Sequence, residues 1–247
     1  LLVTFAFSPV VGLRLSAGWR RHRRNLLQWN EVAAANGMAR TLTGFAPRLS
    51  VSWTPALYHY RDGNGHAVPL RSKWPTFMVD YERGLSTFNA STSYERIETD
   101  VQYTLPLYAL RALYFRGGCG FFTRRGPDCF LDYDYFRNNH LFGNWHDELS
   151  GQFQLLDARW YNESRHYVRL SAAYESPMML FSRLRWLTRV VQKERLYINL
   201  LNVGTLGYYS EWGYGLSTPI VDVAGFIALA GHSQTGIGVK FVLRLGD

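Results

Sequence analysis

The chain alternates between apolar and polar positions over long segments, most clearly near its C-terminus. From Thr235 to Leu245 every second residue is apolar, namely Ile237, Val239, Phe241, Leu243 and Leu245. A period of two places successive side chains on opposite faces of a β-strand. Ordinary strands run for about five or six residues, whereas a tilted strand needs about 9–11 residues to cross a bilayer. The pattern therefore predicts a strand long enough to span a membrane.

The same alternation recurs along the chain. It is clear in residues 11–22, 45–54, 94–105 and 165–175, where one face is apolar and the other polar or charged. Weaker patterns predict strands at 1–7, 74–84, 110–122, 128–136, 149–157, 194–203, 206–214 and 219–229. With the last segment these give about thirteen strands, although bacterial single-chain barrels usually have an even number. We therefore predict an all-β fold, an antiparallel transmembrane β-barrel of which this chain is the C-terminal portion.

The polar faces of the predicted strands carry several charged side chains. The candidates for a barrel lumen are Arg96, Glu98, Asp100, Arg165, Arg169 and Glu175. In a barrel, opposite charges can pair inside a wet lumen, and Arg169 would pair with Glu98, Asp100 or Glu175. In a soluble β-sandwich the same side chains would face bulk water. The alternation within one strand fits both folds.

Strand length and aromatic residues near strand ends favour the barrel, because membrane barrels carry aromatic girdles at both interfaces. The candidates for these girdles are Trp19, Trp53, Trp74, Trp160, Trp212 and Tyr214. With the C-terminus placed in the periplasm, the connections at Pro9, Pro55, Pro106, Pro177 and Pro219 all fall on the periplasmic side. Proline cannot donate to a ladder, so it belongs at strand ends and turns. Residues 24–42 then form a long extracellular loop.

Composition agrees with a barrel that has a lipid face and a wet interior. Charged residues make up 19% of the 247 residues, below the ~25% of soluble domains, while mean hydropathy is only −0.18. No uninterrupted apolar stretch approaches the ~18 residues of a transmembrane helix. The chain starts at Leu1 and shows no secretory signal. Because a barrel must be exported, we expect residues 1–247 to be one outer-membrane barrel domain, incomplete at its N-terminal side, from a Gram-negative cell.

The net charge of +8 raises the question of an anionic partner. Basic residues cluster locally, at 20–24 and again at 183–195, and no nucleic-acid motif accompanies them. We therefore expect outer-membrane lipids and lipopolysaccharide phosphates as partners, with other envelope proteins as further candidates and no nucleic acid. Residues 177–192 fit either an amphipathic helix at the inner-leaflet interface or an ordinary periplasmic loop.

No catalytic or metal-binding motif stands out. A Gly-x-Ser-x-Gly elbow is absent from the sequence. Ser164 and His166 are two positions apart and could share a strand face, but catalytic triads are defined in space and not by such spacing. His140, His146, Asp147 and Glu148 fit no zinc spacing and indicate a polar turn. We predict no catalytic residues, no metal and no cofactor.

Cys119 and Cys129 flank a turn at residues 123–127. If the strands at 110–122 and 128–136 form a hairpin, the two cysteines lie nearly opposite each other. Cross-strand neighbours are about 4.5–5.5 Å apart, which a disulfide can bridge, and export permits oxidation. The pair is a candidate disulfide.

Several motifs resemble an outer-membrane barrel family of the Bacteroidetes type, over most of the chain from about Phe45. They include residues 153–162, 174–177, 193–197, 211–215 and 238–241. That family is a domain of unknown function which usually follows a carboxypeptidase-regulatory-like domain. Val168-Arg169 is also similar to the Val-Arg-Gly motif of BamA-like assembly barrels, although Leu170 replaces the glycine.

We predict a non-enzymatic barrel that serves transport, outer-membrane assembly or as a membrane platform for a periplasmic domain, and the resemblance supplies no biochemical activity for it. Two alternatives from other classes remain. An outer-membrane lipid hydrolase would depend on serine and histidine side chains, and a soluble β-sandwich binding module would stay monodisperse without detergent.

Overall fold

A computed structural model describes most of the chain. The residues it describes are 2–8, 12–25, 41–55, 59–61, 67–69, 73–86, 93–108, 110–125, 149–157, 160, 165–177, 179–180, 190–231 and 233–243. The chain divides into two compact units, Leu1–Thr99 with Gly120–Tyr133 and Asp100–Cys119 with Asp134–Asp247.

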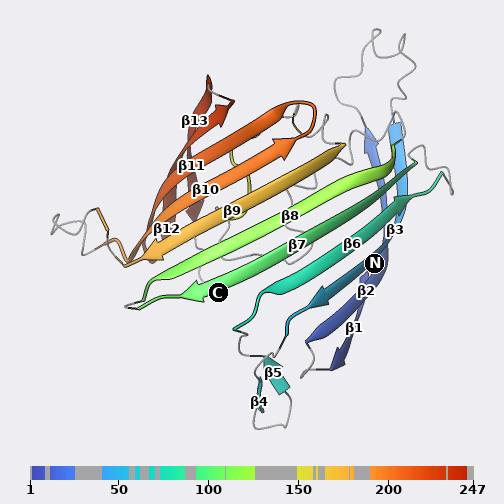
Figure 1. Ribbon diagram of the computed structural model, residues 1–247, viewed down its shortest axis with the longest axis horizontal. Helices are drawn as coiled ribbons and strands as arrows, with labels where there is room; N and C mark the ends of the chain where they lie inside the picture. Colours follow the sequence, from blue (N-terminus) through green and yellow to red (C-terminus); the bar gives the residue numbers. More distant parts are fainter. Residues whose placement is uncertain are drawn as a thin grey trace. The chain divides into compact units, whose positions relative to one another are not determined.

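The described residues form an all-β structure, which confirms the predicted class. The main sheet has 11 strands in the order β1-β2-β3-β6-β7-β8-β9-β10-β11-β12-β13 (Figure 1). Strands β4 and β5 form a separate two-stranded sheet. The strand bounds are β1 Leu2–Ser8, β2 Leu13–Asn25, β3 Thr41–Trp53, β4 His59–Arg61, β5 Ala67–Pro69, β6 Thr76–Gly84, β7 Tyr94–Pro106, β8 Ala112–Arg125, β9 His166–Ser176, β10 Lys193–Val203, β11 Gly207–Ser217, β12 Val221–Ala230 and β13 Ser233–Leu243.

In the first unit the antiparallel ladders are long. Strand β2 pairs with β3 from Leu13 opposite Trp53 to Asn25 opposite Thr41, and β3 pairs with β6 from Arg48 opposite Glu82 to Trp53 opposite Phe77. The rings of Trp53 and Phe77 stack across this ladder at 5.8 Å. The register thus keeps Leu49, Val51 and Trp53 of β3 on one face together with Phe77 and Val79 of β6.

In the second unit, strands β9 to β13 form consecutive antiparallel pairs, visible as neighbouring ribbons in Figure 1. A small hydrophobic cluster lies on the other face from the exposed apolar residues and contains Leu149, Ala173, Tyr197, Ala224 and Phe226. The ring of Tyr197 covers Gly215 on β11, where an added Cβ would lie 3.0 Å from the ring. Glycine at that position lets an aromatic ring lie flat against the sheet.

Most predicted strands correspond to strands of the main sheet, but the predicted count of about thirteen is wrong for this sheet, which has 11 strands. Residues 149–157 were predicted as a strand and instead form turns and bends. The β4–β5 hairpin was not predicted, because its strands have only 3 residues each. The predicted strand at 128–136 lies outside the described residues, as do 178 and 181–189 of the segment 177–192, for which the sequence fits either a helix or a loop. Within the described ranges, no helix has the length and hydrophobicity to cross a membrane.

Candidate functional site

Burial on the strands is the reverse of a soluble protein's. On β9, Arg169, Ser171 and Glu175 are buried, whereas Val168 and Leu170 are exposed at 60% and 49%. Charged residues are almost never buried in soluble proteins unless they are paired. We call the buried, charge-bearing side of the strands the polar face and the exposed side the apolar face.

The apolar face carries large side chains on successive strands of both units. In the first unit the exposed residues are Trp19, Leu49, Val51, Trp53, Phe77, Val79 and Phe121, and in the second they are Val101, Phe115, Val168, Leu170, Leu196, Leu200, Trp212, Ile227, Ile237, Val239, Phe241 and Leu243. Singly exposed apolar side chains are normal, but a continuous series on neighbouring strands marks an interaction surface or a lipid-facing surface.

On the polar face of the first unit, two carboxylates on β6 are fully buried and each collects several donors. Asp80 accepts hydrogen bonds from the hydroxyl of Ser50 and, at 2.5 Å, from Nε of Arg48. Glu82 accepts one from the hydroxyl of Tyr94 and forms an ion pair with Arg96 at 3.0 Å. These charges are removed from water, so each needs its partners to remain ionised at low cost.

On the polar face of the second unit, Asp100 lies between two arginines. Its Oδ2 accepts hydrogen bonds from Nε and Nη2 of Arg116 at 2.8 and 2.6 Å and from Nη2 of Arg169 at 2.5 Å. The side chains of Asp100 and Arg116 are 0% exposed and that of Arg169 is 3% exposed. One buried carboxylate therefore serves two buried guanidinium groups from neighbouring parts of the sheet.

A second ionic cluster lies near the opposite end of β9. Arg195 pairs with Glu175 at 2.9 Å and with Asp222 at 3.4 Å. Lys193 also reaches Glu175, at 2.8 Å, and the hydroxyl of Ser217 donates to Asp222 at 2.5 Å. Strands β9, β10, β11 and β12 are thus joined on one face by charge-assisted hydrogen bonds, which are stronger than neutral ones.

Five of the six predicted polar-face residues are buried there, namely Arg96, Glu98, Asp100, Arg169 and Glu175. Of the carboxylates expected for Arg169, Asp100 pairs with it at 2.5 Å. Arg165 is different, because it is exposed and precedes β9. The ladder between β9 and β10 ends at Tyr167 opposite Val203, so the alternation no longer controls the direction of Arg165.

Residues 149–157, which we call the inner segment, lie across the polar face. The carboxylate of Glu211 accepts hydrogen bonds from two consecutive backbone N–H groups, of Gln154 at 2.7 Å and Leu155 at 2.8 Å. Asn199 donates to the carbonyl of Gln152 at 3.0 Å, and Arg116 donates to the carbonyl of Gly151 at 3.4 Å. Residues 149–157 were expected to pair as a strand in a β-ladder. Their backbone is instead bound by side chains of β8, β10 and β11.

Sequence reasoning missed Arg116, Asn199 and Glu211. The alternation of faces along each strand could have located them, since each lies an even number of positions from another buried residue on the same strand. Glu211, for example, alternates with exposed Trp212, and Asn199 faces Glu211 in the ladder between β10 and β11. Nothing local in the sequence connects them with residues 149–157.

A cavity of about 610 Å³ borders the inner segment, with Leu155, Asp157, Trp160 and Tyr209 among its lining residues. The ring of Trp160 lies 5.2 Å from that of Tyr209 and is buried at 8%. Aromatic packing beside Tyr209 buries Trp160, and its assignment to an interface girdle stays a prediction. Trp19, Trp53 and Trp74 are exposed, and Trp212 is exposed at the middle of β11, opposite Ile198 and Ile227.

Glu194 is the exception on the apolar face. It lies opposite Leu216 in the ladder, yet it is fully buried. One of its carboxylate oxygens, Oε2, accepts hydrogen bonds from the backbone N–H groups of Met179 at 2.9 Å and Leu180 at 2.8 Å. The hydroxyl of Tyr214, a predicted interface aromatic, donates to the same oxygen at 2.6 Å. The connection between β9 and β10 is thus fastened onto the apolar face beside Tyr214.

The remaining sequence candidates carry no site in the described ranges. Cys119 is exposed on β8, and Cys129 lies outside the described residues, so the disulfide stays a prediction. Ser164, His140, His146, Asp147 and Glu148 also lie outside them. The ring of His166 covers Gly204 across the β9–β10 ladder. Among the residues that the structure describes, no three metal-ligating side chains gather.

The family comparison agrees with the resemblance seen in the motifs. A model of the C-terminal domain of DUF5686, a family of unknown function, matches residues 12–216. The chain belongs to the DUF5686 family. None of the curated proteins compared with it matches the chain.

The DUF5686 match covers most of the features described above. It extends from the start of β2 to the end of β11 and includes both ionic clusters up to Arg195, the inner segment and the two carboxylates that hold backbone N–H groups, Glu194 and Glu211. The polar-face network, apart from Ser217 and Asp222, therefore lies within the residues matched by the DUF5686 domain. A family of unknown function supplies no activity for it, so the function has to be argued from the geometry.

Proposed function

We propose that this DUF5686 chain is an integral outer-membrane β-barrel without enzymatic activity, which serves transport, outer-membrane assembly or as a membrane platform for a periplasmic domain. The observation that carries the proposal is the reversed burial of its strands. Charged side chains such as Asp100 and Arg116 are 0% exposed, while Val168, Phe241 and Leu243 on the other face are 60–69% exposed.

Contact of the apolar face with lipid would account for this reversed burial. A surface built of Leu, Val, Ile, Phe and Trp on successive strands is unfavourable in water, since burying apolar area is worth about 25 cal/mol per Å². In a bilayer the same surface is solvated by acyl chains, and the polar groups belong inside. A soluble β-sandwich would place Val168 and Leu170 in its core and Arg169 and Glu175 in water, which is the opposite of the burial observed.

Strand length supports the same conclusion. The strands of the main sheet outside β1 have 9 to 14 residues, whereas soluble strands average about five or six. About 9–11 residues suffice for a tilted strand to cross the hydrocarbon core. Closure into a barrel is the proposed state, because a sheet edge cannot remain unpaired in lipid.

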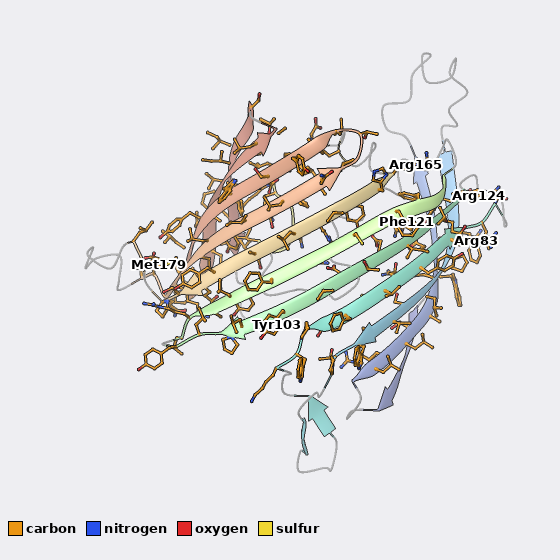
Figure 2. All side chains as sticks on the ribbon, in the orientation of Figure 1. Arg83, Tyr103, Phe121, Arg124, Arg165 and Met179 are labelled. Carbon is orange, nitrogen blue, oxygen red and sulfur yellow. The ribbon has the colours of Figure 1, made fainter. Side chains whose placement is uncertain are left out.

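We propose anionic outer-membrane lipids, lipopolysaccharide included, as the partner of a polar collar in the first unit. Exposed Arg83 and Arg124 lie at the same end of β6 and β8 (Figure 2), and Glu95 is within electrostatic reach of both. The hydroxyl of Tyr81 donates to Glu95, which holds that carboxylate beside the arginines. Arginine binds phosphate with a fixed fork of donors, so the collar suits headgroup phosphates above the apolar face.

The connection held by Glu194 supports a membrane interface at one end of the strands of the second unit. Met179 lies at the end of the strands opposite to Arg165 (Figure 2), and its backbone is fastened to the apolar face beside Tyr214. An apolar side chain such as Leu180, 71% exposed, would reach the inner leaflet there. This arrangement favours the interfacial interpretation of residues 177–192 over a free loop.

The proposal is tested on the full-length protein by membrane fractionation followed by gel electrophoresis of heated and unheated samples. We expect the protein in the outer-membrane fraction, extracted only by detergent, with an unheated band that migrates differently from the heated one. Lipids incubated with the purified protein should be unchanged by mass spectrometry, as expected for a protein without hydrolase activity. A protein that is folded and monodisperse in buffer without detergent overturns the proposal and favours a β-sandwich.

A further inference from the structure

We propose that the inner segment, residues 149–157, is a plug that closes the interior of the barrel, and that Glu211 is the latch that holds it. The inference rests on the proposed function, since a plug needs an interior to close. It adds what the barrel alone does not imply, namely that the protein in this state is not an open pore.

The latch is specific in geometry. The two carboxylate oxygens of Glu211 each take one of two consecutive backbone N–H groups, those of Gln154 and Leu155, at 2.7 and 2.8 Å. The hydroxyl of Tyr209 donates to Oε1 at 2.7 Å and fixes the carboxylate. Hydrogen bonds to a carboxylate are stronger than neutral ones, and a fork of this kind holds the backbone in one register.

Three further contacts spread the segment over the polar face. Asn199 on β10 and Arg116 on β8 bind the carbonyls of Gln152 and Gly151. On β13, Leu155 packs over Gly238, where an added Cβ would lie 2.6 Å from Cδ2 of Leu155. The segment therefore crosses the polar face from β8 to β13, all within the second unit.

The same contacts make the segment displaceable. The residues of the inner segment belong to no β-ladder in the described structure, so side-chain contacts attach it to the polar face, including those of Leu149 in the hydrophobic cluster. The cavity of about 610 Å³ beside Leu155 and Asp157 provides a space adjacent to the segment.

Position is tested by cross-linking on the full-length protein with both natural cysteines replaced by serine. Leu155→Cys combined with Gly238→Cys should give a disulfide on oxidation with copper phenanthroline, because this exchange also relieves the close approach at Gly238. The matched control combines Leu155→Cys with Val239→Cys, whose side chain lies on the apolar face. Cross-linking of the Gly238 pair and not the Val239 pair is expected. No cross-link at Gly238 in folded protein overturns the plug.

Closure is tested by single-channel recording in planar bilayers. Glu211→Gln replaces one acceptor oxygen by an amide donor that faces a backbone N–H group, so we expect its mean conductance to rise several-fold above that of the unaltered protein. Glu194→Gln, the same change on the apolar face, should leave conductance unchanged. A further variant combines Glu211→Gln with Leu155→Cys and Gly238→Cys. Oxidation of this variant should restore the low conductance, and reduction of the disulfide should raise the conductance again.

The outcomes separate the plug from the barrel. If the unaltered protein already conducts like the Glu211→Gln variant, and locking the segment changes nothing, the plug is wrong although the barrel stands. If the protein is not heat-modifiable and needs no detergent, the proposed function fails, and the cross-link then reports only where the segment lies. If Glu211→Gln does not fold, oxidation and reduction of the Leu155–Gly238 pair with Glu211 intact test the plug, and a conductance that is equal in both states overturns it.

Discussion

The ring of Tyr94 lies over Gly84 on the neighbouring strand, so closely that a Cβ added to Gly84 would be 2.5 Å from Cδ1 of that ring. The hydroxyl of the same tyrosine donates a hydrogen bond to the buried carboxylate of Glu82. One side chain thus packs on the backbone of β6 and satisfies a charge on its polar face. Two neighbouring positions in the sheet depend on it.

Gly84→Ala should therefore destabilise the protein. The added methyl group meets the ring of Tyr94, and overpacking of this kind costs about 1–3 kcal/mol. The measurement is the free energy of unfolding in urea after refolding into lipid vesicles, followed by tryptophan fluorescence. Gly225→Ala is the matched control, because a Cβ there meets nothing within 4 Å. An equal loss in both variants would show that strand glycine, rather than the ring, is responsible.

The cluster of Asp100, Arg116 and Arg169 should respond unequally to loss of its members. Asp100→Asn leaves two buried guanidinium groups without their carboxylate, and breaking a buried pair costs about 3–5 kcal/mol. Arg169→Met should cost less, because Asp100 keeps both hydrogen bonds from Arg116. Unfolding in urea measures both values, with exposed Arg165→Ala as the control expected near zero. A larger loss for Arg169→Met than for Asp100→Asn would contradict this assignment of the shared carboxylate.

A charged substitution on the apolar face should show whether this face contacts lipid or water. Leu170 lies near the middle of β9 and is 49% exposed. Leu170→Arg should destabilise the folded protein in the bilayer by about 2–4 kcal/mol, as expected for a lipid-facing site at mid-depth. Folding into vesicles of known lipid composition measures the cost, and Leu170→Ala provides the smaller apolar comparison. If Leu170→Arg folds as well as the unaltered protein and improves its solubility in plain buffer, the face is exposed to water.

The connection between β9 and β10 should loosen when Glu194 loses its charge. Its Oε2 atom accepts the backbone N–H groups of Met179 and Leu180 together with the Tyr214 hydroxyl. In Glu194→Gln we expect faster protease cleavage and faster amide exchange at residues 177–192, read by mass spectrometry. Glu211→Gln should leave this connection protected, since its backbone partners lie in the inner segment. Equal protection in both variants would mean that other contacts hold the connection.

The sequence by itself determined which segments are strands and which residues share a face. A period of two is a local property, so residues 165–175 already separate Val168 and Leu170 from Arg169 and Glu175, and the structure keeps that separation. The same reasoning failed for residues 149–157, whose polar and apolar residues also mimic a strand. Gly151 has a positive φ of 71° there, and the backbone partners are side chains rather than a neighbouring strand.

Only the tertiary structure decided which face is buried and which charges meet. Arg169 and Asp100 are 69 positions apart, and Leu155 and Glu211 are 56 positions apart, so no local pattern brings them together. Strand order and register place these side chains on one face, and the cost of an unpaired buried charge then selects the partners. The alternation in the sequence shows which residues share a face of a strand, but packing with the rest of the chain determines which of the two faces is buried.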